Sequence, residues 1–251
     1  MAKALADNWK WSKTDATLPF TVATVCFAVM MVFAGRCQDK FGPRLVATAG
    51  GIMLGLGLIA SALVHSPTAI MLTFGVGAGL GIGLGYSATT PPAIKWFPPS
   101  RKGFITGIVV SGVGLAAVYI SPLSQYLLKI TTIPWTFAWL GIGTLVLVPL
   151  LAQLLRNPPQ LPVAPAATSQ TPAALRGETG WLAMLGTGQF YQLWLLMVLS
   201  VSAGLMIISQ VAVIAKDQAN WKWGFVPIAA LAIFNTFGRL LAGVVSDKIG
   251  R

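Results

Sequence analysis

Charge is scarce in this sequence. Asp, Glu, Lys and Arg make up 9% of its 251 residues, whereas an ordinary soluble domain carries about a quarter. Hydrophobic residues make up 55%, and several apolar runs reach the roughly 20 residues that a helix needs to cross a bilayer. The lack of charge excludes an ordinary soluble domain and indicates a membrane protein.

Acids are scarcer still, because 6 Asp and Glu stand against 17 Lys and Arg and leave a net charge of +11. A basic balance can indicate nucleic-acid binding, but these bases occur in ones to threes between apolar runs. They form no basic face with interleaved aromatics. Loops on the cytoplasmic side of membrane proteins collect Lys and Arg, so the charge indicates topology and no nucleic-acid partner.

Cysteine and histidine are also nearly absent. Cys26 and Cys37 lie about 16 Å apart along one predicted helix, which is too far for a disulfide, and we interpret both as packing residues. The single histidine, His65, lies in the turn "HSPT" and is interpreted as solvated. No metal-ligand spacing, nucleophile constellation or nucleotide loop is present, so the sequence predicts neither an enzyme nor a cofactor.

The apolar runs predict seven membrane spans. Only helices and closed barrels satisfy backbone groups in lipid, and runs this long lack the alternation of barrel strands. The expected fold class is therefore all-α, a polytopic helical bundle. The predicted spans are 18–35, 45–64, 69–93, 103–128, 135–155, 190–215 and 224–245.

The bases predict the orientation of these spans. The loops at 36–44, 95–102, 156–176 and 248–251 hold three, three, two and two Lys and Arg, and the other side holds six. The first set should be cytoplasmic. This orientation places the N-terminus outside with no preceding helix, so one helix is expected to be missing at the front.

Residues 156–180 are rich in Pro and Ala and poor in charge, which predicts a poorly ordered cytoplasmic connector. The following residues are expected to lie along the membrane interface, with Trp181, Tyr191 and Trp194 as belt aromatics. The predicted domains are an N-terminal helix group, 1–155, a linker and interfacial segment, 156–187, and the start of a C-terminal helix group, 188–251.

Nearly the same phrase occurs twice, as "GRCQDKFGPR" and, 208 residues later, as "GVVSDKIGR". Glycine permits a tight turn, the bases hold it in the cytosol, and an aspartate can accept from a neighbouring helix N-terminus. One copy could be a plain cytoplasmic loop, but two copies indicate the parallel repeats of a secondary transporter. The candidate gating residues are Gly35, Asp39, Lys40, Gly42, Arg44, Gly243, Asp247, Lys248, Gly250 and Arg251.

The repeated phrase resembles the signature loop of the major facilitator superfamily, between helices two and three and again between helices eight and nine. The texts "CQDKFGPR", "GAGLGIGLGY", "KWFPPSRKG" and "NTFGRLLAGVVSDKIGR" are similar to its oxalate:formate antiporter and monocarboxylate-transporter-like branch. The resemblance implies that the spans are helices two to eight of twelve and that the chain is a fragment. The alternate glycines from Gly75 to Gly85 are explained by close helix packing.

Arg239 lies eight residues before Asp247, hence about 12 Å deeper and near the middle of the bilayer. A basic residue there usually faces a cavity, and its planar fork suits a carboxylate. Pairing with another helix and snorkelling to the cytosol are the alternatives. The resemblance implies anion binding at this position. It also places Asn235 where monocarboxylate carriers have an acid, which favours anion exchange over proton coupling.

By the same resemblance Tyr86 matches an aromatic that lines the antiporter's cavity, although ordinary packing explains it equally well. Val113 replaces a further cavity aromatic, which leaves a narrower polar site or a different substrate open. Other polar residues are expected to make helix-to-helix hydrogen bonds. These are Thr89, Thr90, Tyr119, Gln125 and Gln210.

Together these features predict a secondary active transporter that moves small organic anions, such as oxalate, formate or monocarboxylates, by alternating access and as an antiporter. The alternatives are a carrier of the same superfamily for a sugar or drug, and a truncated membrane protein that transports nothing. The expected location is the inner (plasma) membrane, with the linker and the C-terminal end cytoplasmic. The full-length protein is expected to be monomeric, with no cofactor.

Overall fold

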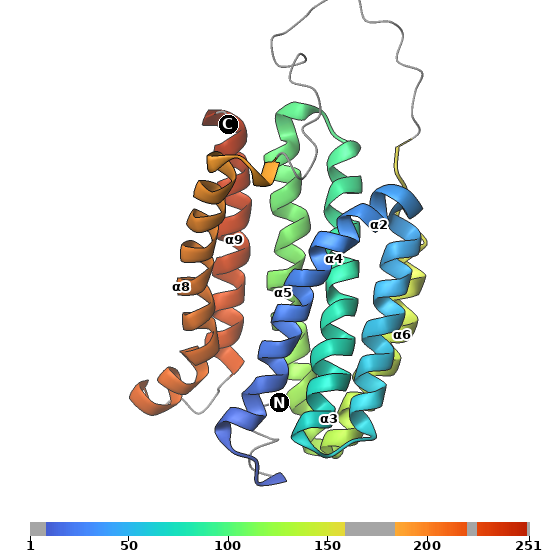
Figure 1. Ribbon diagram of the computed structural model, residues 1–251. Coiled ribbons are helices and arrows are strands. Elements are labelled where there is room, and N and C mark those ends of the chain that lie inside the picture. The colour runs from blue at the N-terminus through green and yellow to red at the C-terminus, as the bar shows by residue number, and fades with distance from the viewer. Residues whose placement is uncertain (1–8, 159–183, 220–224, 250–251) are drawn as a thin grey trace, which may run out of the picture. The chain divides into compact units, whose positions relative to one another are not determined.

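The computed structural model describes residues 9–158, 184–219 and 225–249 (Figure 1). Every regular element in these ranges is a helix, which confirms the all-α fold class. The elements are α2 (Lys13–Ala62), α3 (Pro67–Ile70), the π-helix η1 (Met71–Ala78), α4 (Gly79–Lys95), the 3-10 turn η2 (Pro99–Arg101), α5 (Lys102–Ile130), α6 (Ile133–Ala152), α8 (Gly188–Ala219) and α9 (Phe225–Ile249).

Five helical segments of the described residues are long and apolar enough to cross a membrane. They are Thr14–Ala62, Pro67–Lys95, Lys102–Ile130, Ile133–Ala152 and Ala229–Ile249. The first contains two of the predicted spans, and α8 covers the predicted span at 190–215. Large apolar side chains such as Phe20, Val32 and Leu150 are exposed along these helices, as expected for surfaces that face lipid. The chain is a polytopic membrane protein.

The first long segment, α2, is two helices joined at Gly42. This residue has φ 81° and ψ 163°, a backbone region open essentially to glycine alone. Pro43 follows and suits the first turn of the second helix. Figure 1 shows α2 rising to this point and then returning. The two predicted spans are therefore separate, but the first helix continues to Phe41 rather than ending at Gly35.

The returning half of α2 packs closely on α4, and small residues make this possible. A methyl group at Gly81 would lie 2.5 Å from the backbone nitrogen of Leu54, and one at Gly50 would lie 2.7 Å from that of Gly85. Without a hydrophobic force between helices in lipid, such close van der Waals contact drives their association. The glycines of α4 that face α2 therefore serve close packing of these two helices.

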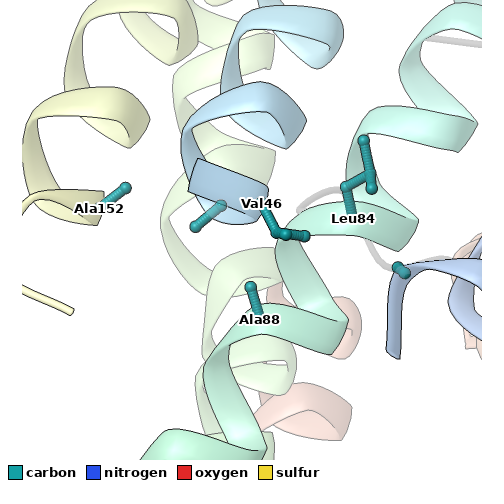
Figure 2. Packing of buried hydrophobic residues seen from close by; sticks show 6 residues of the cluster. Val46, Leu84, Ala88 and Ala152 are labelled. Atoms are coloured by element: carbon teal, nitrogen blue, oxygen red, sulfur yellow. The ribbon is translucent and has the colours of Figure 1, made fainter. Parts of the chain in front are cut away.

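Two clusters of buried residues hold the helices together. The first comprises Ala34, Val46, Ala47, Leu84, Ala88 and Ala152, from both halves of α2, from α4 and from α6 (Figure 2). The second comprises Ala16, Ile70, Ile133 and Phe137, against which Trp9 and Trp11 pack. Most members of the first cluster are alanines, which again permits close approach of backbones.

Cys26 and Cys37 are both unpaired and half-buried, as expected for packing residues. His65 is exposed, as expected, and its ring centroid lies 5.0 Å from that of Trp9.

The chain divides into two compact units, one of Met1–Pro158 with Ala232–Arg251 and one of Pro159–Leu231. The predicted domain boundaries stay predictions, and so does the orientation in the membrane. Most of the predicted connector, together with Trp181, lies outside the described residues. Tyr191 and Trp194 lie within α8 and are exposed.

The turn at Gly42 can be tested by substitution. Gly42→Ala should lower the free energy of unfolding by about 1–3 kcal/mol, because an L side chain is forced into a sparsely populated backbone region. Thermal unfolding in detergent measures this loss. Gly35→Ala is the matched control, since a methyl group there meets nothing within 4 Å and alanine favours a helix. Equal melting temperatures for the two variants would contradict the role of Gly42.

Candidate functional site

The N-terminus of α5 is bound by a carboxylate from α9. Asp247 Oδ1 accepts a hydrogen bond from the backbone N–H of Gly103 at 2.8 Å, and Oδ2 accepts one from that of Phe104, also at 2.8 Å. The first N–H groups of a helix have no partner within it, and the partial positive charge there favours an anion. The residue at the N-cap position, Arg101, makes no capping hydrogen bond with its side chain. Asp247 supplies the missing acceptors from another helix.

Small residues on both helices allow this approach. A methyl group at Gly103 would lie 2.7 Å from the carbonyl oxygen of Gly243, and one at Gly243 would lie 2.5 Å from that of Gly103. One turn further along α5, a methyl group at Gly107 would lie 2.8 Å from the carbonyl oxygen of Arg239. Small residues four apart are a recurrent means of close helix packing in membranes.

The second copy of the repeated phrase is helical as far as Ile249, whereas the sequence predicted that its helix ends at 245 with Asp247 in a loop. An aspartate at a helix end often competes for local backbone N–H groups, but both oxygens of Asp247 are engaged by α5. Gly250 and Arg251 lie outside the described residues.

The first copy has a different environment in the described chain. Asp39 is exposed, and Lys40 lies with its Nζ 5.3 Å from the ring centroid of Phe41. Arg44 is half-buried and donates from Nε to the carbonyl oxygen of Leu155 at 2.9 Å. Gly42 makes a turn of the expected kind, and its counterpart in the second copy lies outside the described residues. The two copies thus share a sequence pattern but not their contacts.

Arg239 and Asn235 lie one turn apart on α9 and interact directly. Arg239 Nε donates to Asn235 Oδ1 at 2.7 Å. The Arg239 side chain is exposed and that of Asn235 is half-buried. A carboxamide oxygen orients the guanidinium without cancelling its charge, so the rest of the fork stays available for an anion. The predicted alternative, pairing with another helix, is not seen among the described residues.

Tyr86 is half-buried on α4, and its ring lies edge-on to Phe27 of α2 with centroids 5.6 Å apart. This contact is packing of the ordinary kind and does not by itself place Tyr86 in a cavity. Val113, at the other position compared with the antiporter branch, is exposed. Of the three predicted substrate-binding residues, Asn235 and Arg239 therefore contact each other, whereas Tyr86 contacts Phe27.

The remaining polar residues were expected to make helix-to-helix hydrogen bonds, and Thr89 departs from this expectation. Thr89 donates to the carbonyl oxygen of Tyr86 within its own helix rather than to a neighbouring one, a bond that satisfies a hydroxyl in lipid without a partner helix. Thr90 is half-buried, Tyr119 and Gln125 are exposed, and the side chain of Gln210 lies outside the described residues. Among described residues, no three His, Cys, Asp or Glu are placed to hold a metal ion.

The whole chain, residues 1–251, matches the Major Facilitator Superfamily. The chain belongs to this superfamily. It is 29% identical over its full length to the oxalate:formate antiporter of Oxalobacter formigenes, of which it covers 58%. It is 27% identical over 99% of its length to an uncharacterized MFS-type transporter, YhjX, of Escherichia coli K12, of which it covers 64%. It is also 25% identical over 97% of its length to the mouse monocarboxylate transporter 11, of which it covers 53%.

This major facilitator chain therefore spans less than two thirds of the length of these curated relatives. Its similarity to an antiporter and to a monocarboxylate transporter agrees with the branch that the sequence motifs indicated.

Sequence reasoning missed the part that Gly103 takes in binding Asp247. A signal was present, because Gly103, Gly107 and Ser111 recur every four residues at the start of α5 and thereby mark a face for close packing. The preceding residue pair, Arg101 and Lys102, has no side chain suited to cap a helix. Together these features indicate a helix that needs an acceptor from elsewhere.

The bond between Asp247 and α5 can be tested by hydrogen exchange. Asp247→Ala should speed amide exchange at Gly103 and Phe104 roughly tenfold, since losing an N-cap acceptor costs about 1–2 kcal/mol. Asp247→Asn should have a smaller effect, because one acceptor oxygen remains. Asp39→Ala, which changes the same residue type in the other copy, should leave both amides unchanged. Unaltered exchange in Asp247→Ala would rule out the cap.

The close approach of the two helices is tested separately. Gly103→Ala should destabilise the protein by about 1–3 kcal/mol, because the added methyl group overpacks the contact with Gly243 and Asp247. Thermal unfolding reports the loss. Gly112→Ala, in the same helix but with nothing within 4 Å of the added methyl group, should be neutral or stabilising. A neutral Gly103→Ala would show that α9 does not pack there.

Proposed function

We propose that this major facilitator chain belongs to a secondary active transporter of small organic anions, such as oxalate, formate or monocarboxylates, that works by alternating access as an antiporter. The observation that carries the proposal is the pair formed by Arg239 and Asn235 on α9. Arg239 is a cation inside a segment that is long and apolar enough to cross a membrane.

A guanidinium within a membrane span is costly unless it is paired or solvated, and such residues usually line a substrate pathway. Arg239 has only a neutral partner among the described residues, so its positive charge is not cancelled. Its planar fork can donate two parallel hydrogen bonds to a carboxylate. A small organic anion both matches this geometry and neutralises the charge.

Asn235 supports exchange rather than proton symport. A carboxylate in its place could carry a proton across the membrane with the substrate, but a carboxamide takes up no proton at physiological pH. An antiporter needs no such group, because the outgoing anion returns the binding site to the other side. The oxalate:formate antiporter among the relatives agrees with this mode.

Alternating access also needs a contact that holds one state and can be released. We assign this role to the repeated phrases, with Asp39 and Asp247 as the acceptors. The Asp247 carboxylate binds two N–H groups at the start of α5, and these bonds can be exchanged for bonds to water when α9 moves away. In this topology that end is cytoplasmic, in the plasma membrane, because the basic loops lie there. Tyr86 would line the cavity from α4.

The test of the anion site is made with the complete product of the reading frame that encodes these residues, reconstituted in proteoliposomes. Arg239→Gln should abolish carboxylate exchange, and carboxylate affinity should fall roughly ten- to hundredfold, the loss expected for a hydrogen bond to a charged group. Arg239→Lys should be intermediate, because it keeps the charge and loses the fork. Lys129→Gln, which removes an exposed base at a helix end, should exchange normally.

Undiminished exchange by a folded Arg239→Gln protein would contradict the role of Arg239 in binding the anion. Thermal shift of the unaltered protein against carboxylates, neutral sugars and drug-like cations tests the substrate class. Stabilisation by carboxylates alone supports the proposal, and stabilisation by a sugar or a drug instead would favour a carrier of another substrate class.

A further inference from the structure

Two side chains from elsewhere in the fold bind the segment that directly follows α6, which ends at Ala152. Arg44 Nε donates to the carbonyl oxygen of Leu155 at 2.9 Å, and Trp96 Nε1 donates to that of Arg156 at 2.8 Å. Arg44 follows the turn of α2, and Trp96 immediately follows α4. Figure 1 shows the turn of α2 and the ends of α4 and α6 at the same end of these helices.

These bonds join three separate parts of the chain, and each part carries a base. Arg44 is itself one donor, Lys95 precedes the other, and Arg156 supplies one of the carbonyl groups that accept. In the described part of the chain none of the three is paired with a carboxylate, and Lys95 and Arg156 are exposed. The C-terminal end of a helix offers about half a negative charge, far less than three bases carry. A net positive charge therefore remains.

Aromatic side chains lie beside these bases. Trp96 is 54% exposed and Phe97 is 45% exposed, although both are large and apolar. They follow directly on a segment, Pro67–Lys95, that is long and apolar enough to cross a membrane. Aromatic rings at such ends sit at the level of the lipid headgroups. The three bases are therefore placed where phosphates of the bilayer lie.

We propose that Arg44, Lys95 and Arg156 form a binding site for the headgroup phosphate of an anionic phospholipid, with Trp96 and Phe97 packing against its upper acyl chains. Basic pockets between membrane helices bind anionic headgroups in this way. Orientation signals alone would need only the number of bases in each loop. They would not need the hydrogen bonds that join three base-carrying parts of the chain just after α6.

A bound lipid would connect two segments of the chain at this site. Arg44 belongs to the first copy of the repeated phrase, and Arg156 stands at the start of the predicted connector. A phosphate between them would neutralise the repulsion of the bases and hold both segments to the membrane surface. This inference concerns lipid and does not rest on the identity of the transported substrate.

The experiment measures lipid binding to the purified chain by native mass spectrometry, with phosphatidylglycerol and phosphatidylcholine compared at equal concentration. The unaltered protein should retain phosphatidylglycerol preferentially. Lys95→Gln combined with Arg156→Gln should bind it roughly thirtyfold more weakly, since each base near an anionic surface contributes about a factor of five. Both residues are exposed, so the fold should be unaffected.

Two variants serve as controls. Lys95→Arg combined with Arg156→Lys keeps both charges and should bind like the unaltered protein. Lys129→Gln removes an exposed base near the opposite end of α5 and should also bind normally. Equal binding of both lipids, or an equal loss in Lys129→Gln, would overturn the proposal. Displacement of phosphatidylglycerol by millimolar inorganic phosphate would likewise overturn it, because the ligand would then be a soluble anion.

Discussion

A helix that begins at a membrane surface must find acceptors for its first backbone N–H groups, and in this protein that requirement joins the second copy of the repeated phrase to the start of α5. The start of α5 has no capping side chain of its own, so its N–H groups are bound by Asp247 of α9. This bond fixes how far α9 can slide along α5. The close contact of Gly103 with Gly243 lies beside it, and Arg239 lies eight residues before Asp247 on the same helix. The proposed anion site and the proposed gate therefore share one helix.

Much of the fold could be predicted because it follows from local properties of the chain. Hydropathy places the membrane helices, and the Gly42–Pro43 pair marks the turn within α2, since only glycine tolerates that backbone conformation. The sequence predicted that an aspartate of the repeated phrase can accept from a neighbouring helix N-terminus, as Asp247 does. Which helix this is could not be predicted in the same way, because the bond joins residues 144 apart in sequence. The sequence predicted an end of α9 that is too early for the same reason. Asp247 has the character of a loop residue, and only its hydrogen bonds from α5 explain its place in a helix. Nor could the sequence predict the hydrogen bonds that Arg44 and Trp96 donate to the carbonyl groups of Leu155 and Arg156, just after α6.

The candidate site shows the same division. The positions of Arg239 and Asn235 follow from helical spacing, because residues four apart lie on one face. This spacing allows a hydrogen bond between their side chains, and the structure contains it. Helical spacing does not predict the role of Tyr86, because a half-buried aromatic on a glycine-rich helix packs in the same way with or without a substrate nearby. Its contact with Phe27 describes how α4 sits on α2 and leaves its part in transport to experiment.

The neutral partner of Arg239 has an electrical consequence. A guanidinium carries one positive charge and a carboxamide carries none, so at the proposed anion site the pair formed with Asn235 would present the same single positive charge on both sides of the membrane. A monovalent anion would make the loaded site neutral, whereas a divalent anion would leave it with one negative charge. Exchange of unlike anions through such a site moves net charge across the bilayer. The membrane potential, rather than a pH gradient, would then act directly on the transport cycle.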